Sequence, residues 1–122
     1  MAEKGSMLTL GQRLSAGDSL ISPLGNFRLL MQLNGNLVIY ARSNHSIVWQ
    51  SHTTGAGNWA LLQSDGNFVV YDPEGSLPLW HSETGRDKVS AERFIALQDD
   101  SNLVIYDPSL APVWSSLGGV VP

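Results

Sequence analysis

Short hydrophobic runs alternate with clusters of Gly, Asn, Asp and Pro along this chain of 122 residues. Val, Ile, Leu, Tyr and Phe dominate the runs, and turn-forming residues interrupt them about every eight to twelve residues. Runs of this length and composition are typical of short β-strands joined by tight turns, and they fit helices poorly. We therefore predict an all-β chain.

The pattern repeats three times. The most similar segments read QLNGNLVIY (Gln32 to Tyr40), QSDGNFVVY (Gln63 to Tyr71) and QDDSNLVIY (Gln98 to Tyr106). An apolar run precedes each segment, at residues 27–31, 59–62 and 94–97. A tryptophan follows each one: Trp49, Trp80 and Trp114. We expect each repeat to form a meander of three or four short strands, with the central turn of the second repeat at residues 64–67.

A single sheet of this size cannot bury its apolar face alone, so three of them should pack around a shared axis. The expected architecture is a three-sided prism or barrel. Because the three tryptophans recur at one place in each repeat, we expect them in the core rather than as platforms for a sugar ring. Trp59 heads a strand where the other repeats have Phe27 and Phe94, and we expect it in the core too.

Composition narrows the range of functions. With 43% hydrophobic and 15% charged residues, the chain fits one compact domain over residues 7–122, and residues 1–6 resemble an expression leader. A net charge of -4 argues against nucleic acid as a partner, and the apolar runs are too short for membrane insertion. The absence of cysteine excludes a disulfide framework. With no signal peptide in view, we expect a cytoplasmic or non-classically released protein, or the mature form of a secreted one.

The repeated segment carries hydrogen-bonding groups at alternate positions. Along an extended strand these side chains would share one face: Gln63, Asp65, Asn67, Val69 and Tyr71. The same spacing gives Gln98, Asp100, Asn102, Val104 and Tyr106 in the third repeat, and Gln32, Asn34, Asn36, Val38 and Tyr40 in the first. A carboxylate, two amides, a phenol and an apolar patch match the hydroxyls and C–H groups of a pyranose. Such a site requires neither a metal nor a cofactor.

The pattern Gln-x-Asp-x-Asn-x-Val-x-Tyr resembles the sugar-site motif of the monocot mannose-binding, or bulb-type, lectins. It occurs twice intact and once with Asn34 in place of Asp, and the resemblance extends over about residues 8–118. It implies a β-prism II fold, with three short four-stranded antiparallel sheets around a pseudo-threefold axis, and binding of α-D-mannosides. By this resemblance Asp65 and Asn67 hold the 2-hydroxyl, Gln63 the 3-hydroxyl, Tyr71 the 4-hydroxyl, and Val69 packs against the ring. The same roles fall on Asp100, Asn102, Gln98, Tyr106 and Val104.

Two features set this chain apart from the pattern. Asn34 replaces a charged acceptor by a neutral amide, and the loss of about 1 kcal/mol predicts roughly five- to tenfold weaker binding there. Plant members usually carry one disulfide, so the absence of cysteine favours a non-plant source. The resemblance also implies that the tail, residues 117–122, crosses to a neighbour in a homodimer. Because single open sites bind weakly, we expect multivalent binding to mannose-containing glycans.

Other classes of function find less support in the sequence. No nucleophile with its base is evident, and His45, His52 and His81 lie at unrelated offsets, so we expect no metal site. Asp65 and Asp100 belong to different repeats and should lie too far apart for a glycosidase pair. The chain is therefore predicted not to be an enzyme. The remaining alternative is a protein-binding or antibacterial prism whose sugar sites are idle or auxiliary.

Overall fold

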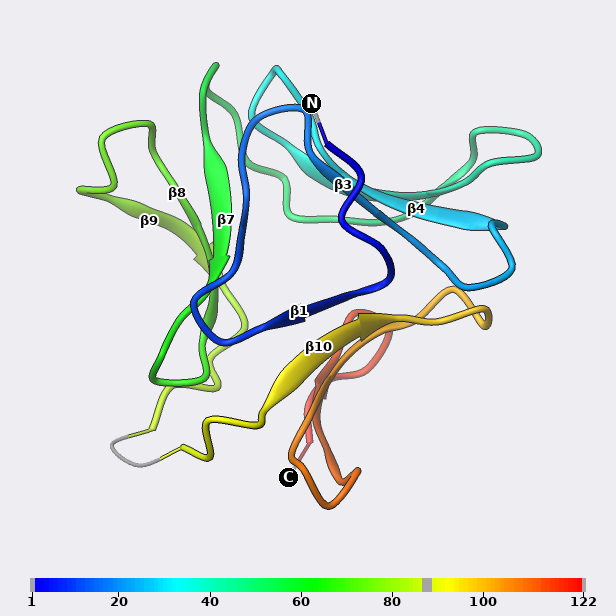
Figure 1. Ribbon diagram of the computed structural model, residues 1–122. Helices are drawn as coiled ribbons and strands as arrows, with labels where there is room; N and C mark the ends of the chain where they lie inside the picture. Colours follow the sequence, from blue (N-terminus) through cyan, green and yellow to red (C-terminus); the bar gives the residue numbers. More distant parts are fainter. Residues whose placement is uncertain (1, 87–88, 122) are drawn as a thin grey trace.

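The computed structural model describes residues 2–86 and 89–121 and consists of β-strands joined by turns (Figure 1). One sheet holds β3 (Ser19–Ile21), β4 (Phe27–Met31), β5 (Leu37–Ala41) and β6 (Ile47–Gln50). A second holds β2 (Arg13–Leu14), β7 (Trp59–Leu62), β8 (Phe68–Tyr71) and β9 (Pro78–His81). The third holds β1 (Met7–Thr9), β10 (Phe94–Leu97), β11 (Leu103–Tyr106), β12 (Pro112–Ser115) and β13 (Gly119–Val120). The predicted all-β prism is confirmed, and this part of the chain holds no helix able to cross a membrane.

The N-terminal segment ties the three sheets together. Its strands β1, β2 and β3 each join a different sheet, next to β10, β7 and β4 respectively. The fourth strand of each sheet therefore comes from this segment, while each repeat contributes three strands. Residues 2–6 also run along β3, where the Lys4 N–H donates to the Ser19 carbonyl at 2.8 Å. At the other end of the chain, β13 extends the third sheet by pairing with β12.

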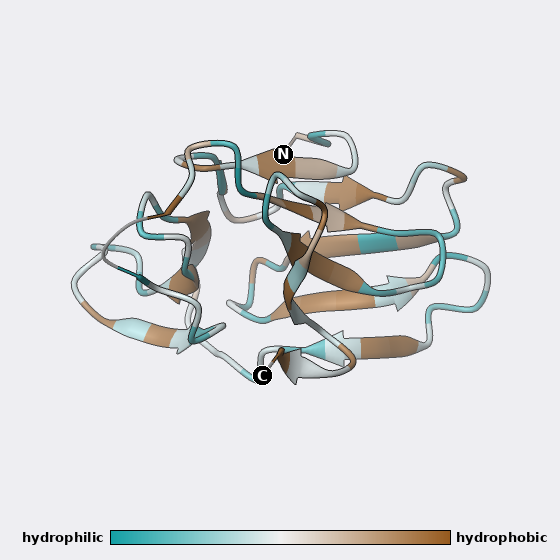
Figure 2. Ribbon diagram, turned by 90° about the horizontal axis from the view of Figure 1, so that it is seen from below, coloured by the Kyte–Doolittle hydropathy of each residue, from teal (hydrophilic) through white to brown (hydrophobic). Residues whose placement is uncertain are grey.

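The core lies where the inner faces of the three sheets meet. Hydrophobic residues are concentrated in the strands (Figure 2), where alternate residues point inward, and Phe68, Val70 and Ile105 are fully buried. The three repeated tryptophans come together there, with ring centroids 5.1 Å apart for Trp49 and Trp80, 5.6 Å for Trp80 and Trp114, and 5.9 Å for Trp49 and Trp114. All three pairs are edge-to-face, a favourable geometry for aromatic rings. The expectation that these tryptophans belong to the core is confirmed.

The expectation for Trp59 is wrong. Trp59 pairs with Tyr71 across β7 and β8 on the outer face, and its inward neighbour is Ala60. Its ring is half-buried and lies 5.0 Å from the ring of Tyr71. The error comes from aligning Trp59 with Phe27, which packs against the core. Strand register instead places Arg28 opposite Tyr40, at the position that Trp59 occupies in the second sheet.

Each motif turn contains one residue in the left-handed region of φ. In the first two repeats this residue is glycine, Gly35 with φ 94° and Gly66 with φ 85°; in the third it is Ser101 with φ 76°. A Cβ atom at Gly35 would collide with the backbone of Gly55, and one at Gly66 with the Arg93 side chain. Glycine is therefore required at both positions, because φ is positive and because there is no room for a Cβ atom. Ser101 adopts the same left-handed conformation, which costs free energy for a residue that has a Cβ atom.

We expect Ser101→Gly to raise the free energy of unfolding by about 1 kcal/mol, because the strain of the left-handed conformation is relieved. Gly66→Ala should lower it by more than that, since strain and collision add. Urea denaturation with a constant m-value measures both changes. An unchanged or lower midpoint for Ser101→Gly would contradict the first expectation.

Candidate functional site

Each motif spans a hairpin turn and the strand that follows it. In the second repeat residues 63–67 form the turn between β7 and β8, and only the end of the motif lies in β8. The picture of one extended strand is therefore wrong for the first half of the motif, because the Gly66 N–H bonds back to the Gln63 carbonyl at 2.9 Å. The turn nevertheless brings the two ends together, since the Gln63 amide donates to the Tyr71 hydroxyl. A register shift before Tyr71 also bends the strand at this point.

The turn holds one polar atom of each central motif residue. Asp65 Oδ1 accepts a hydrogen bond from the Asn67 N–H at 2.9 Å, an Asx turn. Asn67 Oδ1 accepts from the Ser82 hydroxyl at 3.1 Å and from the Thr84 N–H at 3.2 Å. Asp65 Oδ2 has no hydrogen-bond partner among the described residues. Asn67 Nδ2 lies 3.3 Å from His81 Nδ1 at the edge of the site. The fold thus fixes each side chain through one oxygen, leaves Asp65 Oδ2 without a partner in the described part of the chain, and sets Asn67 Nδ2 against His81.

Hydroxyl groups after the tryptophan lock the turn in place. Ser82 Oγ accepts from the Phe68 N–H at 3.0 Å and lies 2.8 Å from Thr84 Oγ1. Thr84 Oγ1 donates to the Gly66 carbonyl at 2.7 Å. These atoms are buried, so the loss of a hydrogen-bond partner would lower the stability of the fold. Ser51 and Thr53 make the matching contacts in the first repeat, with Thr53 Oγ1 donating to the Gly35 carbonyl at 2.6 Å. The sequence signal for this network is a small polar residue at a fixed distance from each tryptophan, whose role was not recognised from sequence.

The third repeat forms a similar site with a different closing loop. Asp100 Oδ1 accepts from the Asn102 N–H at 2.9 Å, and Asn102 Oδ1 accepts from the Ser116 hydroxyl at 3.1 Å. The Gln98 amide lies between the Tyr106 hydroxyl and the Asp100 carboxylate, and it satisfies both when its nitrogen faces the carboxylate at 3.2 Å. Asn102 Nδ2 has no acceptor in the described part of the chain. Gln, Asp and Tyr of this motif therefore form one hydrogen-bonded row.

The first repeat departs from the other two at more than Asn34. Asn34 Oδ1 accepts from the Asn36 N–H at 3.1 Å, which leaves an amide nitrogen where the other sites have a carboxylate oxygen. Asn36 Nδ2 donates to Gln50 Oε1 at 2.9 Å, a contact that matches the one between Asn67 Nδ2 and His81 in the second repeat. Tyr40 is contacted by Arg28 Nη1 at 3.4 Å instead of by the motif glutamine. This site presents donors where the other two present acceptors.

Apolar surface at the sites comes mainly from residues outside the motif. The motif valines retain very little exposed surface, 2% for Val38, 2% for Val69 and 3% for Val104. Larger apolar groups flank the motif tyrosines. Trp59 lies beside Tyr71, and the ring of Phe94 lies 5.5 Å from that of Tyr106. Sequence reasoning missed these neighbours because they depend on strand register and not on spacing within the motif.

Metal-binding geometry is missing from the described parts of the chain. Residues 2–86 and 89–121 contain no group of three His, Asp or Glu side chains close enough to hold an ion. His81 lies at the edge of the second site, and His45 lies against Tyr40 at 5.9 Å between ring centroids. The two histidines therefore border different motif sites on different sheets. What the motif sites offer chemically is neutral hydrogen bonding plus one carboxylate each in the second and third repeats.

The fold and the sequence together match solved lectin structures. A monomeric mannose-binding lectin of the monocot Gastrodia elata is 38% identical, with a TM-score of 0.80 over 94% of this chain and 99% of that one. The chain belongs to the monocot mannose-binding lectin family. The mannose-specific agglutinin of snowdrop (Galanthus nivalis), solved with methyl-α-D-mannoside, is 36% identical to this family member, with a TM-score of 0.73 over 83% of this chain and 88% of that one.

Similarity to this bulb-type lectin chain also extends beyond monocots. A lectin of Marasmius oreades is 28% identical, with a TM-score of 0.83 over 95% of this chain and 93% of that one. Neither a scan against models of protein families nor a search of well-characterised protein sequences gave a match. Lectins bind sugars without transforming them, so this chain is a binding protein and not an enzyme.

The motif asparagine of this lectin chain should serve the fold through its oxygen and the ligand through its nitrogen. Asn67→Asp keeps the acceptor for Ser82 and Thr84, so we expect a nearly unchanged free energy of unfolding and weaker sugar binding at the second site. Asn67→Ala leaves two buried donors without their acceptor and should lower stability by about 1–3 kcal/mol. Thermal or urea unfolding measures this difference. Equal stability of the two variants would refute the structural role of the oxygen.

Proposed function

We propose that this chain binds α-mannosides in its second and third motif sites. The observation that carries the proposal is that the fold holds Asp65 Oδ1 and Asn67 Oδ1, while Asp65 Oδ2 has no partner among the described residues and Asn67 Nδ2 contacts only the exposed His81 ring. Side chains held in this way lose little conformational freedom when a ligand binds. A pyranose hydroxyl both donates and accepts, so a free carboxylate oxygen beside an amide nitrogen can satisfy it fully.

The role of each motif residue follows the family pattern. Asp65 and Asn67 would hold the 2-hydroxyl, Gln63 the 3-hydroxyl and Tyr71 the 4-hydroxyl, with Trp59 adding apolar surface next to the tyrosine. In the third site these roles fall on the matching residues: Asp100, Asn102, Gln98, Tyr106 and Phe94. The snowdrop agglutinin, solved with methyl-α-D-mannoside, supports the choice of ligand. Because the Gln63 amide already contacts the Tyr71 hydroxyl, both groups are placed before the sugar arrives.

Binding at one site should be weak, and useful affinity should come from several sites. A few hydrogen bonds to neutral hydroxyls contribute about 0.5–1.5 kcal/mol each, and association entropy opposes much of that sum. The sites lie on the outer faces of different sheets, so one particle can engage several branches of a glycan. Such tethering raises apparent affinity by roughly 10²–10⁴.

Calorimetric titration with methyl α-mannoside and with a branched trimannoside tests this function. We expect weak binding of the monosaccharide, tighter binding of the branched ligand, and at least tenfold loss of both in the double variant Asp65→Ala, Asp100→Ala, because a charged acceptor is removed at each site. The matched control is Glu74→Ala, Glu92→Ala, which removes the same charge from exposed positions outside the motifs. A folded wild type that gives no heat with either sugar would favour the protein-binding alternative.

We also propose that two chains associate by exchanging β13. Two residue pairs, Trp114 with Val120 and Ser115 with Gly119, and one backbone hydrogen bond from Val121 to the Val113 carbonyl at 3.0 Å hold this short strand on β12, so the same pairing can form between chains. Leu117, Val120 and Val121 are exposed apolar residues that an exchanged dimer would cover.

Light scattering after gel filtration should find a dimer for the full chain and a monomer for a chain ending at residue 116. The truncation removes β13 but keeps Ser116, whose hydroxyl supports Asn102. The Gastrodia lectin described as monomeric shows that the family also includes single chains. A full-length monomer at all accessible concentrations would overturn the exchange.

A further inference from the structure

The first sheet lies in a stretch of the chain that carries no acidic side chain. Between Asp18 and Asp65 the sequence contains neither Asp nor Glu, although the whole chain has a net charge of -4. The same stretch contains Arg28 and Arg42. Charge is therefore distributed unevenly among the three sheets, and the first sheet is the positive one.

Arg28 occupies the place of an aromatic ring. Strand pairing sets Arg28 opposite Tyr40 as it sets Trp59 opposite Tyr71 and Phe94 opposite Tyr106. One guanidinium nitrogen, Nη1, lies 3.4 Å from the Tyr40 hydroxyl. The Nε atom of Arg28 is buried and has no hydrogen-bond partner among the described residues. A buried donor without an acceptor is costly, so the described part of the chain does not fully satisfy the Arg28 guanidinium.

The residues that follow the motif tyrosine reverse the local charge. The second and third repeats continue with Asp72-Pro73 and Asp107-Pro108, whereas the first continues with Ala41-Arg42. The Leu77 N–H, with the Ser76 hydroxyl, holds the pKa of Asp72 below its usual range, so this carboxylate stays ionised beside the second site. Asp107 forms an ion pair with Arg93 at 3.0 Å. At the first site Ala41 stands at the position of these carboxylates, and the guanidinium of Arg42 follows one residue later.

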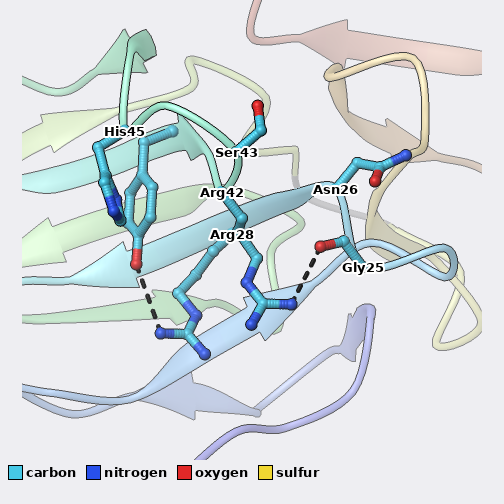
Figure 3. A pocket seen from close by; sticks show the side chains of 7 residues that line it. Gly25, Asn26, Arg28, Arg42, Ser43 and His45 are labelled. Atoms are coloured by element: carbon cyan, nitrogen blue, oxygen red, sulfur yellow. Dashed lines mark hydrogen bonds between the residues drawn. The ribbon is translucent and has the colours of Figure 1, made fainter.

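Arg28 and Arg42 line the same hollow, about 440 Å³ in volume, together with Tyr40 and His45 (Figure 3). Arg42 is held there by Nη1, which donates to the Gly25 carbonyl at 3.0 Å. Neither arginine forms an ion pair with a carboxylate of the described chain. Acidic residues do lie at the adjacent turn: Asp99 accepts from the Leu24 N–H at 2.8 Å, and Glu3 lines a separate hollow with Leu24 and Gly25.

This hollow continues into the sugar site of the first motif. Tyr40 and His45 also line the neighbouring hollow of about 330 Å³, whose other walls include Gln32 and Val38. His45 is kept between the two by a φ of 58° and by its N–H, which donates to the Ala41 carbonyl at 2.8 Å. A ligand placed on the motif residues would therefore extend toward the two guanidinium groups past Tyr40.

We propose that the first motif site binds a hexose that carries an oxyanion at C6, with the anion between Arg28 and Arg42. The proposal rests on the proposed function in one respect, the placement of the sugar 4-hydroxyl at the motif tyrosine. In a hexopyranose C6 is attached to C5, the ring carbon next to C4, so a sugar with its 4-hydroxyl at Tyr40 carries its C6 group on the side that faces the arginines. Guanidinium groups offer paired N–H donors that match the oxygens of a carboxylate or a phosphate.

The replacement of Asp by Asn34 fits the same ligand. A carboxylate at this position would repel an anionic sugar, and the amide removes that charge while keeping the turn through Oδ1. The substitution that weakens binding of a neutral mannoside at the first site therefore favours an acidic one.

Titration of ¹⁵N-labelled protein, followed by NMR, tests the proposal with four probes: methyl α-D-mannopyranosiduronate, mannose 6-phosphate, methyl α-mannoside and inorganic phosphate. We expect the two acidic sugars to shift signals of residues 25–28 and 40–45, including the Arg28 side-chain Nε–H. The neutral mannoside should mainly shift signals of residues 63–71 and 98–106. Inorganic phosphate should bind at least tenfold more weakly than mannose 6-phosphate, since it lacks the ring.

Arg28→Gln and Arg42→Gln should each weaken the acidic sugars about tenfold or more at the first site, because each removes a charged hydrogen-bond donor. The neutral mannoside should still shift the second and third sites, which shows that the variants are folded. Lys4→Gln is the matched control, as it removes one positive charge from an exposed side chain outside the hollow.

Three results would overturn the inference: acidic sugars that shift only the second and third sites, inorganic phosphate that binds as tightly as mannose 6-phosphate, or affinities unchanged by both arginine variants. The proposed function fails separately, if the neutral mannoside shifts neither the second nor the third site. A difference between the two acids shows whether the hollow accepts a carboxylate at C6 or a phosphate one bond further out, and binding of either acid supports the inference.

Discussion

Edge-to-face packing of three tryptophans on the prism axis is the interaction on which the rest of the structure depends. Trp49, Trp80 and Trp114 each come from the last strand that a repeat contributes to its sheet, and each touches the other two. Without cysteine the chain has no covalent link between sheets, so this contact and the surrounding aliphatic core must hold them together. Removing one such ring from a core typically costs about 3–5 kcal/mol, a large share of the stability of a small domain. With the large rings used inside, the outer faces are free to carry polar groups.

The same inward packing explains how the polar motif residues are held in place without being buried. The strand that ends in each tryptophan continues into a hydroxyl-rich loop, and that loop holds the motif asparagine and the turn before it. In the second repeat Ser82 and Thr84 connect the end of β9 to Asn67 and to the Gly66 carbonyl. The geometry of the polar atoms on the outside therefore depends on hydrogen bonds that are themselves shielded from water, where such bonds are strongest. The motif sites need this support, because the described residues around them include no metal-binding group and no ion pair that would organise their side chains.

Local pattern was sufficient to predict the fold class, the three repeated strands and the inward tryptophans, because each depends on alternation within a few residues. Strand register could not be predicted in the same way. The off-by-one alignment of Phe27 with Trp59 hid the fact that Arg28 faces Tyr40, a relation fixed only by pairing between β4 and β5. The contribution of the N-terminal segment to all three sheets was also invisible, since Met7–Thr9 and Arg13–Leu14 carry no signal that assigns them to distant repeats.

The three repeats hold their motif turns in the same way, so the sites can differ from one another without loss of the fold. The atoms that hold each turn are backbone groups and the inner oxygen of Asn36, Asn67 or Asn102, and they are the same in kind in all three repeats. The atoms that face outward do not hold the turn. Asn34 can therefore replace Asp, and Arg28 an aromatic ring, with the turn intact. Stability constrains the motif atoms that hold the turn, whereas the outward-facing atoms can vary with the ligand. Differences confined to the outward-facing atoms, as in the first repeat, are therefore better explained by a different ligand than by decay of the site, because decay would also disturb the hydrogen bonds that hold the turn.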